Sequence, residues 1–389
     1  MKQVEKLPPN ATVSKAPPRL RSESIDLLRI FSMLAIVTLH IMGHGGVLKK
    51  LEPFSWQYYF CWTLEGVCYI AVNCYVLISG YFQSTSRFKL KKLLILCWQT
   101  LFYAVTIYAV LTAAGLITFS WENARLMLIP LLSKRYWYVT VYAALYALSP
   151  FLNGAVRAMP KRTHFSLLLV LLLLFSGLPT FLDKITNGLN FGGGYGIVWF
   201  VALYLLAAYL RRYYTPDFRT GRHLLRFAVF ALLVPLSKFC VMWLSKTPLL
   251  QDVKLSDTFF KYNSILVLLS SLFAFLLFLN LKINNRILAK GIAVIAPLTF
   301  GVYLIHEHPS LRGILWKFID APAWAGSRRL IVFLPAAILG IFLACIIIEQ
   351  LRTFLFKPLL ASRRLDGFCG RAEERICRAV DRWAREEVS

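Results

Sequence analysis

Long apolar runs alternate with short polar segments along most of the chain. Each run is close to the ~20 residues that an α-helix needs to cross the hydrocarbon core of a bilayer. The pattern predicts ten membrane-spanning helices, at 25–48, 56–80, 92–118, 137–156, 164–182, 195–210, 223–244, 262–281, 291–308 and 329–350. We therefore expect an all-α, polytopic membrane protein.

The amino-acid composition supports this class. Hydrophobic residues make up 58% of the chain and charged residues only 16%, whereas soluble domains contain about a quarter charged residues. The proline-containing stretch 1–24 lacks the apolar core of a signal peptide and is expected to be a disordered basic tail. Residues 25–350 form the predicted ten-span domain, and 351–389 form a basic amphipathic tail.

Lysine and arginine residues predict how the chain lies in the membrane. Of the 44, 28 fall in the two tails and in the alternate loops on their side, and 13 fall in the opposite loops. Because loops rich in lysine and arginine stay in the cytoplasm, we expect both termini to be cytoplasmic and the protein to lie in the cell membrane. The net charge of +25 then reflects topology and contact with lipid headgroups, and we expect no nucleic-acid partner.

The C-terminal tail has a helical pattern of its own. Cys369, Ile376, Val380 and Trp383 recur at helical spacing, with arginines on the other face. The pattern is typical of a helix that lies at the membrane interface, and a solvated charged tail explains it equally well. Neither interpretation brings chemistry to the tail.

The first predicted span carries two basic groups, Arg29 and His40, inside an apolar stretch. They are eleven residues apart, which at ~100° per residue puts them on nearly the same helix face, ~16 Å apart along the axis. Asp26 can pair with Arg29 on that face. A snorkelling arginine and a hydrogen-bonded interior histidine would also explain the pattern.

Further polar groups lie in other predicted spans. Glu65 lies in the second span, and His306, Glu307 and His308 end the ninth. Because ionisable groups in a membrane are costly and usually face the interior, we expect the helices to surround a polar cavity. No metal is expected there, because the sequence HEHP lacks the HExxH spacing of zinc proteases and no CxxC pair occurs.

Four segments in order along the chain resemble a known family. IDLLRIFSMLAIVTLH at 25–40 matches an arginine–ten residues–histidine motif, and AVNCYVLISGYF at 71–82 ends in Ser-Gly-Tyr. RYWYVTVYAALYALSPFL at 135–152 and LTFGVYLIHEHP at 298–309 follow. All four are similar to landmarks of the acyltransferase 3 family, whose core usually has ten spans.

The resemblance implies an activity and a catalytic pair. The family transfers acyl groups, most often acetyl, from a cytoplasmic donor to hydroxyl groups of cell-surface carbohydrates. By this resemblance His40 is the catalytic residue and Arg29 its essential partner. We therefore expect acetyl-coenzyme A as the acyl-donor co-substrate, no permanently bound cofactor, and a carbohydrate or glycolipid acceptor.

One departure from the family concerns the donor. An arginine cluster commonly follows the Ser-Gly-Tyr segment, whereas this chain has SRFKLKK at 86–92. We expect Arg29 and the basic residues of this stretch to bind the phosphates of the donor: Arg87, Lys89, Lys91 and Lys92. Lysine lacks the bidentate fork of arginine, so the residue that replaces the cluster stays open.

A second set of residues is expected along the acceptor path. Aromatic faces suit sugar rings, and polar groups can bind sugar hydroxyls or the reacting oxygen; the candidates are Glu65, Tyr81, Trp137, Tyr138, Tyr303 and His306. Anchoring at the membrane interface is the simpler explanation for the aromatic members.

A function of another class stays open. Ten spans, ionisable groups in the membrane and a glycine run, GGGYG at 192–196, also suit an exporter of a polysaccharide or lipid-linked sugar. In that case the polar cavity would be a conduit, and His40 would not catalyse a reaction.

Overall fold

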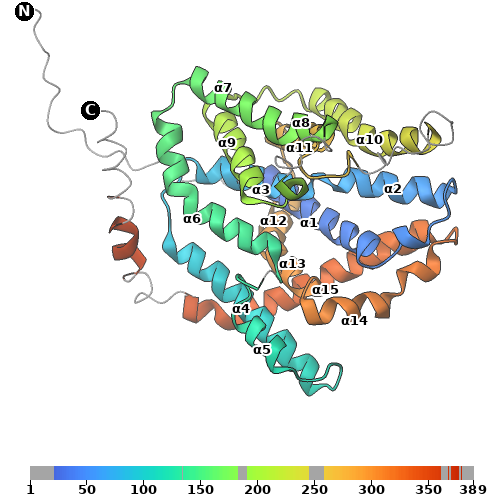
Figure 1. Ribbon diagram of the computed structural model, residues 1–389. Helices are drawn as coiled ribbons and strands as arrows, with labels where there is room; N and C mark the ends of the chain where they lie inside the picture. The colour runs from blue at the N-terminus through green and yellow to red at the C-terminus, as the bar shows by residue number, and fades with distance from the viewer. Residues whose placement is uncertain are drawn as a thin grey trace, which may run out of the picture.

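A computed structural model describes residues 22–133, 135–182, 191–244 and 258–360, and residues 367, 369–375 and 378 near the C-terminus. The N-terminal tail up to residue 21 and the stretch 379–389, with Val380 and Trp383, lie outside the described residues, as does Ile376. The described part contains helices and no strand (Figure 1). This confirms the all-α class.

Helices α1 to α15 form one bundle (Figure 1). Their bounds are α1 Glu23–Gly43, α2 Trp56–Cys68, α3 Ile70–Gln83, α4 Leu90–Ala113, α5 Trp121–Leu128, α6 Trp137–Ala158, α7 Lys161–Leu172, α8 Leu178–Phe181, α9 Ile197–Tyr213, α10 Thr220–Leu244, α11 Ile265–Leu279, α12 Arg286–Ile295, α13 Thr299–His306, α14 Pro309–Ile319 and α15 Leu330–Leu360. Short 3₁₀ segments follow α1 and α12, and another follows α14.

Eight helical stretches of the described chain are long and apolar enough to cross a membrane. They correspond to eight of the ten predicted spans, and they support a multi-pass membrane protein. The other two predicted spans are the shorter helices α9, of 17 residues, and α11, of 15 residues. Both helices are largely buried within the bundle. A helix that is surrounded by other helices carries apolar side chains on all of its faces, as these two do.

Three of the predicted spans are each broken into two helices. The second span is α2 and α3, which meet at Tyr69, and the fifth is α7 and α8, separated by the π-helical segment Leu173–Gly177. The ninth is α12 and α13, separated by the 3₁₀ segment Ala296–Leu298. Pro297 lies in that segment, and its missing N–H and fixed φ favour such a break. Apolar periodicity alone does not reveal these breaks.

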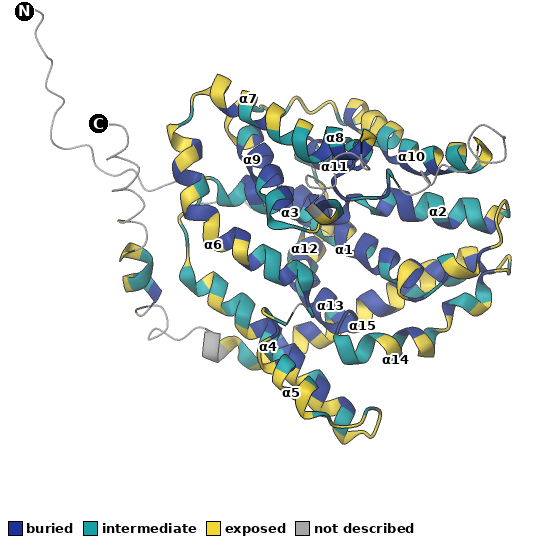
Figure 2. Ribbon diagram, in the orientation of Figure 1, coloured by how far each residue is buried: buried dark blue, intermediate teal, exposed yellow. Residues whose placement is uncertain are grey.

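α1 lies at the centre of the bundle and packs against α2, α3, α11, α12, α13 and α15. Figure 2 shows buried residues along α1 and exposed ones on the outward faces of α7 and α10. Many of the exposed side chains are large and apolar, among them Leu169, Leu225 and Ile347. These outward faces suit contact with lipid, whereas the central position of α1 places its polar groups inside the protein.

The glycine of the Ser-Gly-Tyr segment sets the distance between α3 and α9. A Cβ atom on Gly80 would lie 2.9 Å from both the Cβ of Ala207 and the Cα of Tyr204. Small residues allow such close helix packing in membranes. The close contact holds α3 against the buried helix α9, and α3 in turn packs on α1.

Candidate functional site

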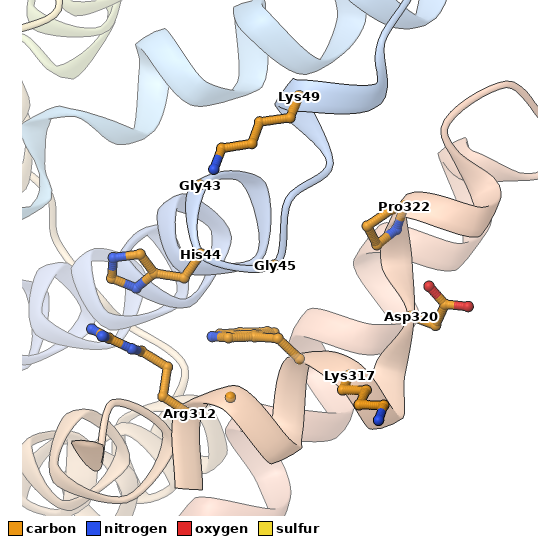
Figure 3. Close-up of a pocket in the computed structure, with 10 residues that line it drawn as sticks. Gly43, His44, Gly45, Lys49, Arg312, Lys317, Asp320 and Pro322 are labelled. Atoms are coloured by element: carbon orange, nitrogen blue, oxygen red, sulfur yellow. The ribbon is translucent and has the colours of Figure 1, made fainter. Parts of the chain in front are cut away.

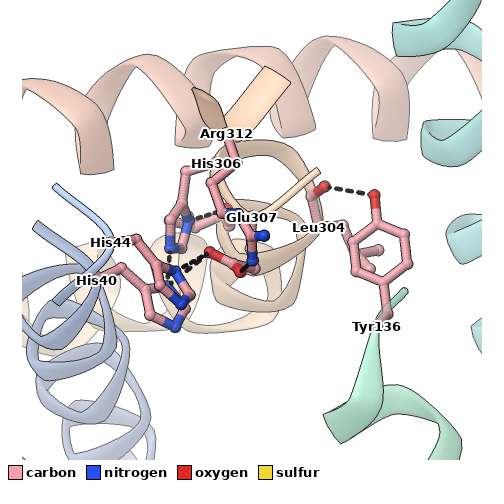
Figure 4. A network of polar contacts seen from close by, with 8 residues as sticks. His40, His44, Tyr136, Leu304, His306, Glu307 and Arg312 are labelled. Carbon is pink, nitrogen blue, oxygen red and sulfur yellow. Dashed lines mark hydrogen bonds and ion pairs between the residues drawn. The ribbon is translucent and has the colours of Figure 1, made fainter. Parts of the chain in front are cut away.

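Two of the histidines singled out in the sequence meet in the structure. His40, near the end of α1, and His306, the last residue of α13, are joined by a hydrogen bond of 2.8 Å between His40 Nδ1 and His306 Nε2 (Figure 4). His306 is fully buried, and the His40 side chain is 18% exposed. The direct packing of α1 against α13 brings these distant residues together.

The surroundings of His306 define which nitrogen atoms carry protons. His306 Nδ1 lies 2.6 Å from the backbone oxygen of Val302, and a carbonyl oxygen only accepts hydrogen bonds, so Nδ1 is the donor. The neutral His306 ring then accepts at Nε2, and His40 donates from Nδ1. The Nε2 atom of His40 is left with a free lone pair and forms no hydrogen bond in the described part of the chain.

A carboxylate lies beside this pair. Glu307 Oε2 is 3.3 Å from His40 Nδ1 and accepts a hydrogen bond of 3.2 Å from His44 Nδ1, while Oε1 accepts one of 2.6 Å from Arg312 (Figure 4). Glu307 follows the last residue of its span. Burial raises the pKa of its carboxyl group, but the hydrogen bond from His44 and the nearby histidines and Arg312 lower the pKa by more, to about 2. The carboxylate is therefore ionised at neutral pH.

His40, His44 and Glu307 line an internal cavity of about 380 Å³. Its other polar and charged lining groups are Glu65, Arg135 and Arg312. Aromatic side chains form much of the wall: Tyr69, Tyr75, Trp137, Tyr138, Tyr195, Tyr262, Phe300 and Tyr303. A concave site with an aromatic wall and a few convergent polar groups is typical of small-molecule binding.

Most of the expected acceptor residues lie at this cavity. Glu65, Trp137, Tyr138 and Tyr303 all line it, and His306 contacts it through His40. Tyr81 does not: its ring packs on Phe275, and the Arg211 guanidinium lies 4.9 Å from its centre. Tyr81 is near the end of α3, whereas the cavity begins further back along that helix, so its aromatic ring stabilises helix packing instead.

The expected donor residues lie at the other end of α1. Arg29 pairs with Asp26, and its guanidinium is 5.9 Å from the centre of the Phe82 ring at the end of α3. The loop that follows α3 and the first turn of α4 carry the basic stretch, which comprises Arg87, Lys89, Lys91 and Lys92. Arg29 thus lies at the end of the bundle where this stretch begins. Its backbone oxygen accepts a hydrogen bond from Tyr75, a residue of the cavity wall.

His44 and Arg312 are not among the site residues predicted from the sequence, and no role is predicted for Glu307. A signal for His44 exists, because residues four apart share a helix face and His44 follows His40 at that spacing. His308, in contrast, is structural: its Nε2 bonds to the Ala104 oxygen and its Nδ1 accepts from Ser310 N.

The same residues have the geometry of a metal site. Ligand atoms of His40, His306 and Glu307 lie within 4.8 Å of one another, and two histidines with a carboxylate are a known zinc-binding set. In the structure these atoms are paired with one another and with protein donors.

The fold and the site define a helical, multi-pass membrane protein with a paired histidine in an internal cavity. The family model of an acyltransferase domain, acyltransferase 3, matches residues 22–349. The chain belongs to this family and is a membrane acyltransferase. Comparisons with curated proteins and with solved structures give no match.

Proposed function

We propose that the protein is an O-acyltransferase that moves an acetyl group from acetyl-coenzyme A to a hydroxyl group of a cell-surface or cell-wall carbohydrate. The observation that carries the proposal is the state of His40. Its Nδ1 donates to His306, so its Nε2 is a neutral base at the wall of the cavity. A neutral imidazole nitrogen next to a bound hydroxyl group is suited to general-base catalysis.

The reaction follows from this base. As the acceptor oxygen attacks the thioester carbonyl carbon, its proton passes to His40 Nε2. The tetrahedral intermediate then collapses, the carbon–sulfur bond breaks, and the proton passes to the departing coenzyme A thiolate. While His40 carries both protons, the Glu307 carboxylate, 3.3 Å from Nδ1, stabilises its positive charge.

A covalent relay is the alternative route with the same residues. His40 Nε2 would attack the thioester, form an acyl-imidazole and release coenzyme A, and the acceptor hydroxyl would then attack the acyl group. The two routes differ in kinetics. The relay predicts release of one equivalent of coenzyme A without an acceptor, and general-base catalysis does not.

The donor is assigned to the end of the bundle that contains Arg29. Arg29 and the basic residues of the α3–α4 loop and the first turn of α4 supply charge for the phosphates of coenzyme A: Arg87, Lys89, Lys91 and Lys92. Arg29 and His40 are ~16 Å apart along α1, a distance that the extended pantetheine arm can cover. Arg29 therefore binds the donor and does not touch the reacting atoms.

The acceptor is assigned to the cavity. Trp137, Tyr138 and Tyr303 offer ring faces for a sugar, and Glu65 offers a carboxyl group whose Oε2 is buried and forms no hydrogen bond within the described residues. Leaving a buried carboxyl oxygen unpaired is costly. A sugar hydroxyl that donates to Glu65 would remove this cost and orient the ring.

The experiment compares cells that carry the wild type, a deletion, His40→Ala and His223→Gln at matched membrane abundance. His223 lies at the start of α10, bonded to Asp217, and serves as the control for loss of a buried histidine. We expect the O-acetyl signal of the surface glycan, measured by NMR, in the wild type and in His223→Gln only. Acetylation that persists in all four strains while surface glycan falls would instead indicate an exporter.

A further inference from the structure

A second cavity, of about 520 Å³, adjoins the first. The two cavities share three wall residues: Gly43 at the end of α1, His44 directly after it, and Arg312 of α14. The second cavity lies at the end of α1 that is remote from Arg29. We call it the basic vestibule, after the cations that line it: Lys49, Arg312 and Lys317.

The charge of the basic vestibule is not neutralised by its own residues. Lys49 comes from the 3₁₀ segment after α1, and Arg312 and Lys317 come from α14 (Figure 3). Asp320 is the one carboxylate among the described lining residues. Arg312 pairs with Glu307, whereas Lys49 and Lys317 form no ion pair in the described part of the chain. Two elements thus hold several cations around one open space, and their mutual repulsion favours an anion there.

The position of the basic vestibule relates it to the acceptor. From His40 to His44 is one helical turn, ~6 Å, so the vestibule begins about one sugar unit from the reacting nitrogen. An acceptor whose hydroxyl lies at His40 Nε2 would extend its next unit past His44 and Arg312 into the vestibule. The aromatic wall and Glu65 belong to the first cavity, and Lys49 and Lys317 belong to the vestibule.

We propose that the basic vestibule binds an anionic group of the acceptor, a carboxylate or a phosphate, next to the sugar that is acylated. This inference rests on the proposed function. Lys49 and Lys317 are the residues that determine this specificity, because ammonium groups form strong charge-assisted hydrogen bonds with oxyanions. They take no part in the chemical step.

The test uses the purified full chain in lipid nanodiscs, with acetyl-coenzyme A and three matched acceptors. These are a neutral oligosaccharide and the same oligosaccharide with a hexuronate or with a phosphate diester next to the reacting sugar. We expect K49Q and K317Q each to raise KM for the charged acceptor by about tenfold and to leave kcat, and KM for the neutral acceptor, unchanged. The two charged acceptors distinguish a carboxylate from a phosphate.

The control is K290Q, which removes an exposed lysine of α12 that lines neither cavity, and it should leave every KM unchanged. Equal losses for charged and neutral acceptors would overturn the proposal. A raised KM for acetyl-coenzyme A in K49Q and K317Q would also overturn it, because the vestibule would then belong to the donor.

A binding measurement separates this proposal from the proposed function. If no oligosaccharide is acylated, the proposed function fails, and calorimetric titration of the same three oligosaccharides still tests the vestibule. Tighter binding of a charged oligosaccharide that weakens in K49Q and K317Q, but not in K290Q, supports an anion site. Equal binding of charged and neutral oligosaccharides by the wild type rejects it.

Discussion

The tautomer of His40 depends on a backbone carbonyl group four residues before His306. The Val302 oxygen holds the proton of His306 on Nδ1, and this leaves His306 Nε2 to orient His40. We therefore propose that His306 is a positioning residue that acts through His40. In metal sites and catalytic triads, too, a hydrogen-bond partner on one ring nitrogen orients the histidine and determines which nitrogen has a free lone pair.

The role of His306 can be tested by removing or replacing its acceptor atom. In His306→Ala, His40 loses the partner of Nδ1 and is no longer held in one orientation, so we expect kcat to fall about 10²-fold, in keeping with the cost of small misplacements. His306→Gln keeps an oxygen that can accept the bond and should retain kcat within about tenfold of the wild type. Steady-state kinetics at matched protein amounts measure both.

Rescue by glutamine is the informative result for His306. A residue that only fills space in the core would lose activity and folded protein together, and glutamine would not restore kcat selectively. Equal kcat values for the alanine and glutamine variants would contradict the positioning role.

The cluster of His40, His306 and Glu307 makes a second prediction, about metals. Protein hydrogen bonds already pair its ligand atoms, so we expect acetyl transfer to stay within twofold of the untreated rate after dialysis against EDTA. Elemental analysis of the purified protein should find no stoichiometric zinc. A rate that falls with EDTA and returns with zinc would show that these residues are metal ligands.

At the scale of elements, the close packing of α3 against α9 leaves no room for a side chain at Gly80. A Cβ atom at Gly80 meets Ala207 and the backbone of Tyr204 at 2.9 Å. We expect Gly80→Ala to force the two helices apart and to lower stability by about 1–3 kcal/mol, the usual cost of overpacking. Thermal unfolding in detergent, followed by the loss of the monodisperse peak, measures the effect.

Gly340 in α15 is the matched control for this prediction. A Cβ atom there meets no heavy atom within 4 Å, so Gly340→Ala should leave the unfolding temperature unchanged or raise it slightly. The same unfolding temperature for Gly80→Ala and the wild type would show that α3 and α9 adjust to the methyl group.

The positions of the helices could be predicted from the sequence because lipid imposes them. A segment that crosses a bilayer must be apolar along its length and must satisfy its own backbone, and the prediction at 137–156 accordingly falls within α6, Trp137–Ala158. The break at Tyr69 carries no such signal, because the residues on both sides are equally apolar. The span predicted at 262–281 corresponds to the shorter helix α11, Ile265–Leu279, and its burial among neighbouring helices could not be predicted from periodicity alone.

For the candidate site, too, some features could be predicted from the sequence and others could not. His40 and His306 stand out in the sequence because ionisable groups are rare in spans, but their hydrogen bond joins residues 266 positions apart and follows from tertiary packing alone. Arg312 lies in a polar segment where an arginine is unremarkable. Its role becomes visible only through its contact with the buried Glu307.

At the scale of the whole molecule, the orientation in the membrane decides how the two ends of α1 are used. The end with Arg29 adjoins the basic stretch at 87–92, and the end with His44 adjoins the basic vestibule. Coenzyme A esters are made in the cytosol, and surface glycans lie outside. The donor and acceptor assignments therefore require the first turn of α1 to face the cytoplasm, which the distribution of lysine and arginine favours.

This orientation predicts the labelling of two exposed loop residues by a membrane-impermeant maleimide, in a variant that lacks the natural cysteines. Asn284, between α11 and α12, should face the cytoplasm, and Arg328, between α14 and α15, should face outward. We expect Arg328→Cys to be labelled in intact cells and Asn284→Cys only after permeabilisation. The reverse pattern would place the basic vestibule in the cytoplasm, beside the pool of acetyl-coenzyme A. The vestibule would then have to be assigned to the donor phosphates, and Arg29 to the acceptor side.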